Sequence, residues 1–134
     1  SEYIVNKRKS FFINGINFST KDGTAIRDFI HVVDLCKIHI LIIKNIDRLK
    51  NSIFNCGYGK GYSVLEVFNT AKKNFKKEMK FQAHPRRKGD IESSVANVNK
   101  IKKILKFHPK FNNISKIIKS SVNWEKKLLR KKIN

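Results

Sequence analysis

Short segments typical of β-strands alternate along this chain with longer amphipathic segments typical of α-helices. The strand-like segments lie at residues 10–13, 53–56 and 80–84. The helical segments lie at residues 33–49, 63–75, 98–106 and 114–129. Neither an internal repeat nor a low-complexity linker interrupts this alternation. The pattern therefore predicts one domain of the α/β class over residues 1–134.

Two of the predicted helices carry strong local signals. The segment 33–49 is apolar over much of its circumference, which predicts packing on more than one side. Ser63 and Glu66 have the spacing of a capping box, in which a serine oxygen and a glutamate satisfy amide donors at a helix start. We therefore expect the second helix to begin at Ser63.

The formal net charge of +20 is the composition feature that bears most on function. A basic surface gains affinity for nucleic acids from counterion release at phosphates. Twenty-four of the thirty basic residues are lysines, however, and they are spread from Lys7 to Lys132 with no aromatic residues interleaved to stack on bases. We therefore predict no nucleic-acid partner, and we keep a small basic nucleic-acid-binding module as the rival from another functional class.

Cysteine usage and hydropathy point to the cytoplasm. Cys36 and Cys56 are too few for a disulfide scaffold, and Cys36 with His39 is too small a set for a metal site. No apolar stretch is long enough to span a bilayer, and no signal peptide is recognisable. The chain begins at Ser1 rather than methionine, which we interpret as a truncated or processed product. We expect no metal and no membrane contact.

Two partial matches to dinucleotide-enzyme motifs do not hold. The loop Gly57–Gly61 places Tyr62 where the GxGxxG fingerprint needs its third glycine, so we interpret it as a tight turn. Tyr3 and Lys7 have the Tyr-x-x-x-Lys spacing that lowers a catalytic tyrosine's pKa. We interpret this short match as chance. We assign no catalytic residue to this chain.

Three charged elements form the better candidate site: Arg27, the pair Arg86 and Arg87, and Asp90. A diphosphate needs cations that converge from different segments, and the planar guanidinium suits phosphate oxygens better than an ammonium group. Only six of the thirty basic residues are arginines, and three of them lie in these two loops. The alternative is a solvated charged loop.

Several sequence motifs, in order along the chain, resemble those of UDP-glucose 4-epimerases, which belong to the extended short-chain dehydrogenase/reductase superfamily. The similar stretches are INGINF at 13–18, DGTAIRDFIHVVDL at 22–35, IFNCGYGKGYSVLEV at 53–67, PRRKGD at 85–90, LKFHP at 105–109 and the helix residue Trp124. The stretch at 85–90 matches the family pattern PRRxGD at every fixed position. The resemblance covers nearly the whole chain.

The resemblance assigns roles to individual residues. Arg27 and Arg87 would hold the two phosphates of UDP, and Asp90 would accept hydrogen bonds from the ribose hydroxyls. Ser94 would line the sugar pocket. The residues expected in the strand beside the uracil are Phe12, Ile13 and Asn14, with Asn14 standing where the family usually has phenylalanine.

The resemblance also implies a reaction and its limits. The family oxidises C4 of a UDP-sugar with bound NAD and returns hydride to the other face of the 4-keto sugar, so that UDP-glucose and UDP-galactose interconvert. The catalytic tyrosine and lysine and the NAD loop would lie upstream of Ser1, in a missing Rossmann domain against which the segments 33–49 and 53–56 would pack. This chain would then be inactive alone and part of a homodimeric enzyme. The rival enzymes are nucleotide-sugar decarboxylases and dehydratases.

Overall fold

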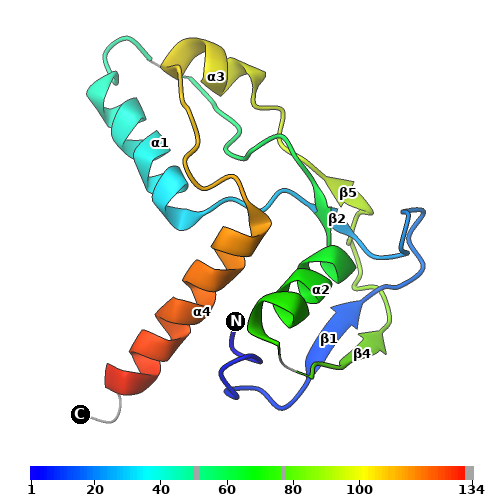
Figure 1. The fold of residues 1–134 in the computed structure, drawn as a ribbon. Coiled ribbons are helices and arrows are strands. Elements are labelled where there is room, and N and C mark those ends of the chain that lie inside the picture. Colours follow the sequence, from blue (N-terminus) through cyan, green and yellow to red (C-terminus); the bar gives the residue numbers. More distant parts are fainter. Residues whose placement is uncertain (50–51, 77, 132–134) are drawn as a thin grey trace.

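Two small sheets and four helices make up the computed structural model, which describes residues 1–49, 52–76 and 78–131 (Figure 1). Strand β1 (Phe11–Asn14) pairs in parallel with β4 (Phe81–His84). The second sheet has the order β3-β2-β5, formed by Tyr62–Ser63, Ile26–Arg27 and Ser93–Ser94. Strand β2 is antiparallel to β3 and parallel to β5. The α/β class predicted from the sequence is confirmed.

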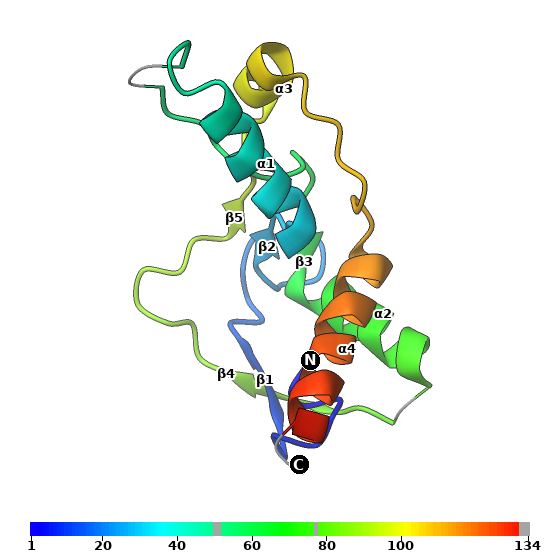
Figure 2. The same cartoon turned by 90° about the vertical axis from the view of Figure 1, so that its left-hand side faces the viewer.

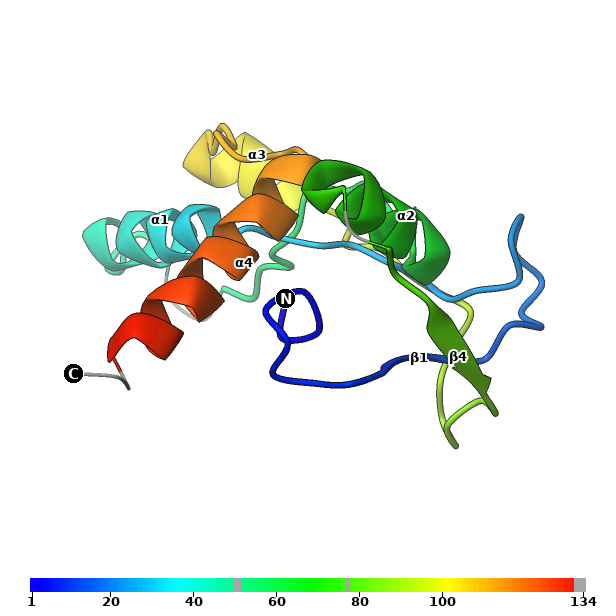
Figure 3. The same cartoon turned by 60° about the horizontal axis from the view of Figure 1, so that its bottom comes forward.

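The helices form two apolar clusters. Helix α1 (Val32–Lys44) and helix α3 (Asn99–Leu105) share one cluster, in which Ile38 and Ile101 are buried. Helix α2 (Val64–Phe75) and helix α4 (Ile114–Lys131) share the other, which also receives N-terminal side chains. Figures 2 and 3 show α4 crossing beside α2, with the N-terminal residues close to both helices. Phe11 of β1 packs against the second cluster.

The N-terminus of α2 is fixed by the Asp-Gly-Thr sequence. The predicted capping box is confirmed: the Glu66 amide donates to Ser63 Oγ at 3.0 Å, and the Ser63 amide donates to Glu66 Oε2 at 2.7 Å. Ser63 Oγ also hydrogen-bonds Asp22, and Thr24 Oγ1 accepts from the Leu65 amide at 3.1 Å. Gly23 has φ +75°, and a Cβ there would lie 2.2 Å from the Ile16 carbonyl oxygen, so only glycine fits.

Two sequence predictions are wrong at the end of α1. The helix ends at Lys44 rather than residue 49, and hydrogen-bonded turns follow up to Leu49. Asn45 donates its side-chain amide to the Leu41 carbonyl at 2.8 Å, which satisfies a terminal helix acceptor. Residues 53–56, predicted as a strand, form no regular secondary structure and pair with no strand of the described chain.

An apolar face of α1 remains exposed. Its large side chains include Val32 at 64% exposure, Ile40 at 50% and Ile43 at 67%, and Ile53 nearby in sequence is 83% exposed. Contiguous apolar surface of this kind marks an interaction site or an aggregation liability. None of the described helices has both the length and the apolar character that crossing a bilayer requires.

We expect the 134-residue chain alone to be poorly soluble or partly molten because of this face. Dye uptake at the exposed apolar side chains, with weak near-UV circular dichroism, is the expected result. A sharp cooperative unfolding transition without dye uptake would contradict this prediction.

Candidate functional site

Three of the four charged residues that the sequence analysis named, Arg27, Arg87 and Asp90, converge beside the β3-β2-β5 sheet. Arg27 ends β2, and its guanidinium lies 3.8 Å from Asp90 Oδ1. Arg87 reaches the same carboxylate with Nε 2.8 Å from Oδ2 and its terminal nitrogen 3.2 Å from Oδ1. Segments 60 residues apart in sequence thus present two guanidinium groups to one carboxylate. An anion with several oxygens could bridge the same two arginines.

Asp90 is held in place by a tight turn. Its amide donates to the Arg87 carbonyl at 3.1 Å, and Gly89 takes φ +84° within the turn. The hydrogen bond from Arg87 is the main cause that lowers the pKa of Asp90. Partial burial opposes this effect, and the charges of Arg87 and Arg27 reinforce it. Asp90 is therefore ionised at neutral pH and available as a hydrogen-bond acceptor.

The structure separates the two neighbouring arginines. The Arg86 guanidinium lies 4.0 Å from the Phe18 ring centre and donates to Asn17 Oδ1 at 2.7 Å. Arg86 therefore anchors the 15–18 turn, whereas the Arg87 side chain is 68% exposed and able to meet a ligand. Of the adjacent arginines, only Arg87 has its guanidinium at the Asp90 cluster.

Ser94 lies beside Arg27. The two residues are register partners in the parallel pairing of β2 with β5, and Ser94 is exposed. Both line a cavity of about 500 Å³ whose remaining walls come from Asp28 and from the segments 54–56 and 95–97. The geometry thus places the predicted phosphate residue and the predicted sugar-pocket residue in one cavity.

The expected uracil strand lies in the other sheet. The Phe12 ring lies tilted against His84 with ring centres 4.4 Å apart, and both residues line a cavity of about 460 Å³ together with Asn14. Ile13 is only 1% exposed, so its side chain belongs to the core and could offer a ligand nothing but its backbone. Residues 85–92, which carry Arg87 and Asp90, connect the two sheets (Figure 2).

Asp28 is a central residue that the sequence analysis missed. Its carboxylate accepts hydrogen bonds from the amides of Tyr58 at 3.0 Å, Gly59 at 2.9 Å and Ala96 at 3.4 Å. Two amides of the Gly57–Gly61 loop are thus already satisfied and cannot cradle a pyrophosphate. This geometry agrees with the interpretation of the loop as a tight turn. The available signal was the carboxylate directly after Arg27.

A second buried carboxylate, Asp34, joins the start of α1 to the chain before α4. It is fully buried and accepts from Tyr58 Oη at 2.8 Å, the Phe111 amide at 2.8 Å and the Lys110 amide at 3.1 Å. Burial opposes its ionisation, but these hydrogen bonds and the charge of Lys37 hold the pKa of Asp34 below its ordinary value. Burial and the nearby Asp34 raise the pKa of Tyr58 to about 12. The phenol therefore remains protonated and donates.

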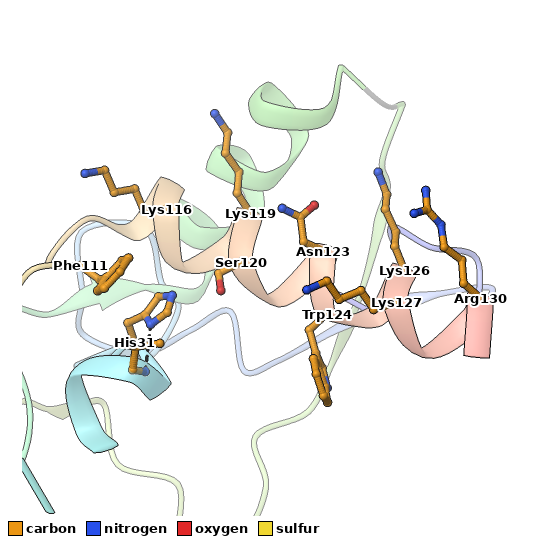
Figure 4. Close-up of a pocket in the computed structure, with 11 residues that line it drawn as sticks. His31, Phe111, Lys116, Lys119, Ser120, Asn123, Trp124, Lys126, Lys127 and Arg130 are labelled. Atoms are coloured by element: carbon orange, nitrogen blue, oxygen red, sulfur yellow. Dashed lines mark hydrogen bonds between the residues drawn. The ribbon is translucent and has the colours of Figure 1, made fainter. Parts of the chain in front are cut away.

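A basic groove lies along α4 (Figure 4) and shares no lining residue with the Arg27 cavity. The cavity has a volume of about 670 Å³, and its lining contains four lysines and an arginine but no carboxylate. His31, Phe111 and Trp124 line it too, with the His31 and Phe111 rings stacked 4.3 Å apart. The sequence expectation that no aromatic residue is interleaved with the lysines does not hold for this groove, because Phe111 and Trp124 lie in the same stretch of chain as its lysines and folding adds His31.

The remaining motif residues have other contacts. Lys7 pairs with Glu125, and the Tyr3 hydroxyl accepts from the Lys80 amide at 3.5 Å. His39 Nδ1 lies 2.8 Å from the Leu35 carbonyl oxygen. Within residues 1–49, 52–76 and 78–131, no three His, Cys, Asp or Glu side chains gather as a metal site would require. These contacts add no catalytic group to the site.

Comparison with known proteins points in one direction. Residues 5–57 match the family model described as the NAD dependent epimerase/dehydratase family. The chain is 42% identical over 118 residues to the UDP-glucose 4-epimerase of Lacticaseibacillus casei, and 44% identical over 103 residues to that of Dictyostelium discoideum. These alignments cover 87% and 75% of this chain but only 36% and 30% of the relatives. The chain thus spans about a third of the length of the curated relatives it matches.

Solved structures agree with the sequence relatives. A UDP-glucose 4-epimerase from Bifidobacterium longum, in complex with NAD+ and UDP, superposes with a TM-score of 0.87 at 37% identity. The UDP-Glc/GlcNAc 4-epimerase from Campylobacter jejuni superposes with a TM-score of 0.83 at 38% identity. Both matches cover 94% of this chain and less than two fifths of the other. By sequence and by fold, this chain is similar to about a third of a UDP-glucose 4-epimerase, and its residues 5–57 match the NAD dependent epimerase/dehydratase family.

Proposed function

We propose that this chain is the UDP-sugar-binding portion of a UDP-glucose 4-epimerase and that it holds the diphosphate between Arg27 and Arg87. The observation that carries the proposal is the convergence of these two arginines on Asp90, beside the cavity that Ser94 lines. Asp90 would exchange part of its contact with Arg87 for the ribose hydroxyls. Relatives and solved structures named as UDP-glucose 4-epimerases support this assignment over a decarboxylase or dehydratase.

In the complete enzyme, NAD would supply the oxidation at C4 of the sugar and the return of hydride. The chain described here offers no dinucleotide loop, because Asp28 already takes the Tyr58 and Gly59 amides. We therefore assign NAD binding and the catalytic tyrosine and lysine to a Rossmann domain outside this chain. The role of the present residues is to bind and orient the UDP-sugar.

The exposed apolar face of α1 would pack on that Rossmann domain. Val32, Ile40 and Ile43 are all at least half exposed, which is costly for a surface that meets only water. Within the complete enzyme we further propose a cytoplasmic location and a homodimer. The chain alone would be inactive.

The proposal is tested by titrating UDP, UMP, uridine and ADP into the chain at one ionic strength. Affinity should rise from uridine to UMP to UDP, since each phosphate adds contacts with an arginine. ADP carries the same charge as UDP but a different base, so it controls for attraction to the basic surface. Equal affinities for ADP and UDP, or for uridine and UDP, would contradict the proposal.

The size of Ser94 leads to a prediction about substrate choice. A small side chain at this wall of the cavity would leave room for a 2-acetamido group, so we propose that the complete enzyme also epimerises UDP-N-acetylglucosamine and UDP-N-acetylgalactosamine. The structural relative from Campylobacter jejuni, named as a UDP-Glc/GlcNAc 4-epimerase, supports this expectation. Ser94→Tyr should reduce turnover of the acetylated sugars and leave UDP-glucose turnover nearly unchanged.

Ser94→Ala is the matched control, because alanine is also small and should keep both activities. The prediction is wrong if the unmodified enzyme ignores the acetylated sugars. It is also wrong if tyrosine at this position changes neither activity.

The nucleic-acid alternative is tested at the basic groove of α4. A nucleic-acid-binding module would bind random DNA with micromolar affinity near physiological salt and with a steep salt dependence. Because the chain has a single tryptophan, Trp124, its fluorescence reports directly on this groove. If the chain is instead part of an epimerase, we expect it to bind random DNA weakly and to lose this binding near physiological salt.

A further inference from the structure

The carboxylate of Asp28 joins three segments of the chain behind the candidate site. The loop at 57–59 donates two amides to it, and Ala96, just after β5, donates a third at 3.4 Å. The Asp28 amide itself donates to the Ser94 carbonyl at 3.1 Å. Asp28 thus connects the end of β2 to both neighbouring segments through side chain and backbone together.

These segments carry or border the walls of the Arg27 cavity. The lining includes Arg27, Ser94 and Ala96, together with the residues just before the 57–59 loop. Arg27 reaches Asp90, while Asp28, which lines the same cavity, accepts from the loop amides. The carboxylate therefore fixes the backbone from which the guanidinium extends.

The packing around Asp28 leaves no spare room. A Cβ added at Gly57 would lie 2.4 Å from Asp28 Oδ2 and 2.7 Å from the Ala96 Cβ. Gly57 has no positive φ, so its need for glycine comes from this close approach rather than from backbone conformation. Glycine at 57 and aspartate at 28 are thus parts of one arrangement.

We propose that Asp28 is a positioning residue for the UDP-sugar site: its carboxylate locks the 57–59 loop and the residues after β5 against β2, and so holds Arg27 and Ser94 at the spacing that a UDP-sugar needs. The inference rests on the proposed UDP-binding role of Arg27. Replacing Asp28 would leave three backbone donors competing for fewer acceptor oxygens, and the end of β2 would shift.

The first test needs no ligand. NMR spectra of Asp28→Asn and Asp34→Asn are compared with those of the unmodified chain at the Arg27 Nε group and at the Gly59 and Ala96 amides. Asp34 is the matched control, because it is another carboxylate with several donors but holds the Tyr58 hydroxyl and the chain before α4 rather than the backbone of the 57–59 loop or Ala96. Asp28→Asn should shift or broaden all three signals, whereas Asp34→Asn should leave those of Arg27 and Ala96 in place. An unchanged Arg27 signal in folded Asp28→Asn would overturn the proposal.

Gly57→Ala disturbs the same contact by adding a methyl group next to the Asp28 carboxylate. It keeps the carboxylate but displaces it, so it should reproduce the Arg27 and Ala96 shifts of Asp28→Asn. This variant decides the question if Asp28→Asn does not fold. A Gly57→Ala chain with unperturbed Arg27 and Ala96 signals would overturn the proposal.

A double-mutant cycle then measures the functional coupling. Asp28→Asn should weaken UDP binding about tenfold in the unmodified chain and much less in an Arg27→Ala background, because the residue acts through Arg27. Equal losses in both backgrounds would overturn the positioning role. If the unmodified chain binds no UDP, the proposed function fails, and the NMR comparison alone decides whether Asp28 positions Arg27.

Discussion

Asp34→Ala should destabilise this chain more than any other substitution considered above, by about 3 kcal/mol or more in the free energy of unfolding. The substitution leaves the Tyr58 hydroxyl and the Lys110 and Phe111 amides without their acceptor in the interior. Each buried donor that loses its partner costs its desolvation. Urea unfolding of the complete enzyme, followed by circular dichroism, measures the loss.

Asp47→Ala is the matched control for that experiment. Asp47 lies just after α1 and is exposed, so its replacement should change the unfolding free energy by less than about 0.5 kcal/mol. Similar losses for Asp34→Ala and Asp47→Ala would mean that the buried network contributes nothing specific.

Because Asp34 accepts its buried hydrogen bonds as a carboxylate, we also expect the folded chain to lose stability in acid. The pKa of Asp34 is lower in the folded chain than its ordinary value of 3.8, so the folded state favours the ionised carboxylate. Its stabilising contribution is complete above the unfolded pKa and is lost as the pH falls through the folded pKa. Asp34→Asn should therefore flatten the loss of stability below about pH 4. If the unfolding free energy of Asp34→Asn falls below about pH 4 as steeply as that of the unmodified protein, the lowered pKa of Asp34 is contradicted.

Local signals in the sequence predicted much of the fold. The Ser63 and Glu66 spacing predicted the start of α2 because a capping box satisfies its amides within four residues. Amphipathic spacing likewise predicted α3 and α4 to within about two residues at each end. These elements are determined by neighbours in sequence, so the sequence alone reveals them.

Elements that depend on distant partners were not predictable in this way. Strands β2, β3 and β5 contain two residues each, too few for an alternating pattern, and they exist because Ile26 pairs with Ser63 and Ser93. Residues 53–56 have strand-like composition, yet the fold provides no strand beside them. Strand formation needs a hydrogen-bonding neighbour, which local composition does not specify.

The candidate site likewise combines residues that the sequence identifies with contacts that only the tertiary structure determines. Arg27, Arg87 and Asp90 could be named from residue type and motif, and folding brings them together. The different fates of Arg86 and Arg87 depend on Phe18 and Asn17, which only the tertiary structure places beside Arg86. Sequence reasoning finds residues whose chemistry is distinctive, but it does not show which of two equal side chains is already engaged.

Arg27→Ala should have the largest effect on ligand binding. We expect UDP affinity to fall by about 1.5 to 3 kcal/mol, or about 10- to 150-fold in Kd, which is typical of a lost charge-assisted hydrogen bond. The Arg27 side chain is 28% exposed and is already fixed near Asp90, so little ordering cost offsets its contact with phosphate. Arg87→Ala should also weaken UDP binding, by about tenfold.

Calorimetric titration of UDP into the complete enzyme and into its Arg27→Ala, Arg87→Ala and Lys88→Ala variants tests the phosphate assignment most directly. Lys88 has the same charge as Arg87 and lies in the same exposed loop, so it controls for the loss of one positive charge. The account predicts clear losses for both arginine variants and almost none for Lys88→Ala. Equal effects of Lys88→Ala and Arg87→Ala, or unchanged UDP affinity in Arg27→Ala, would contradict it.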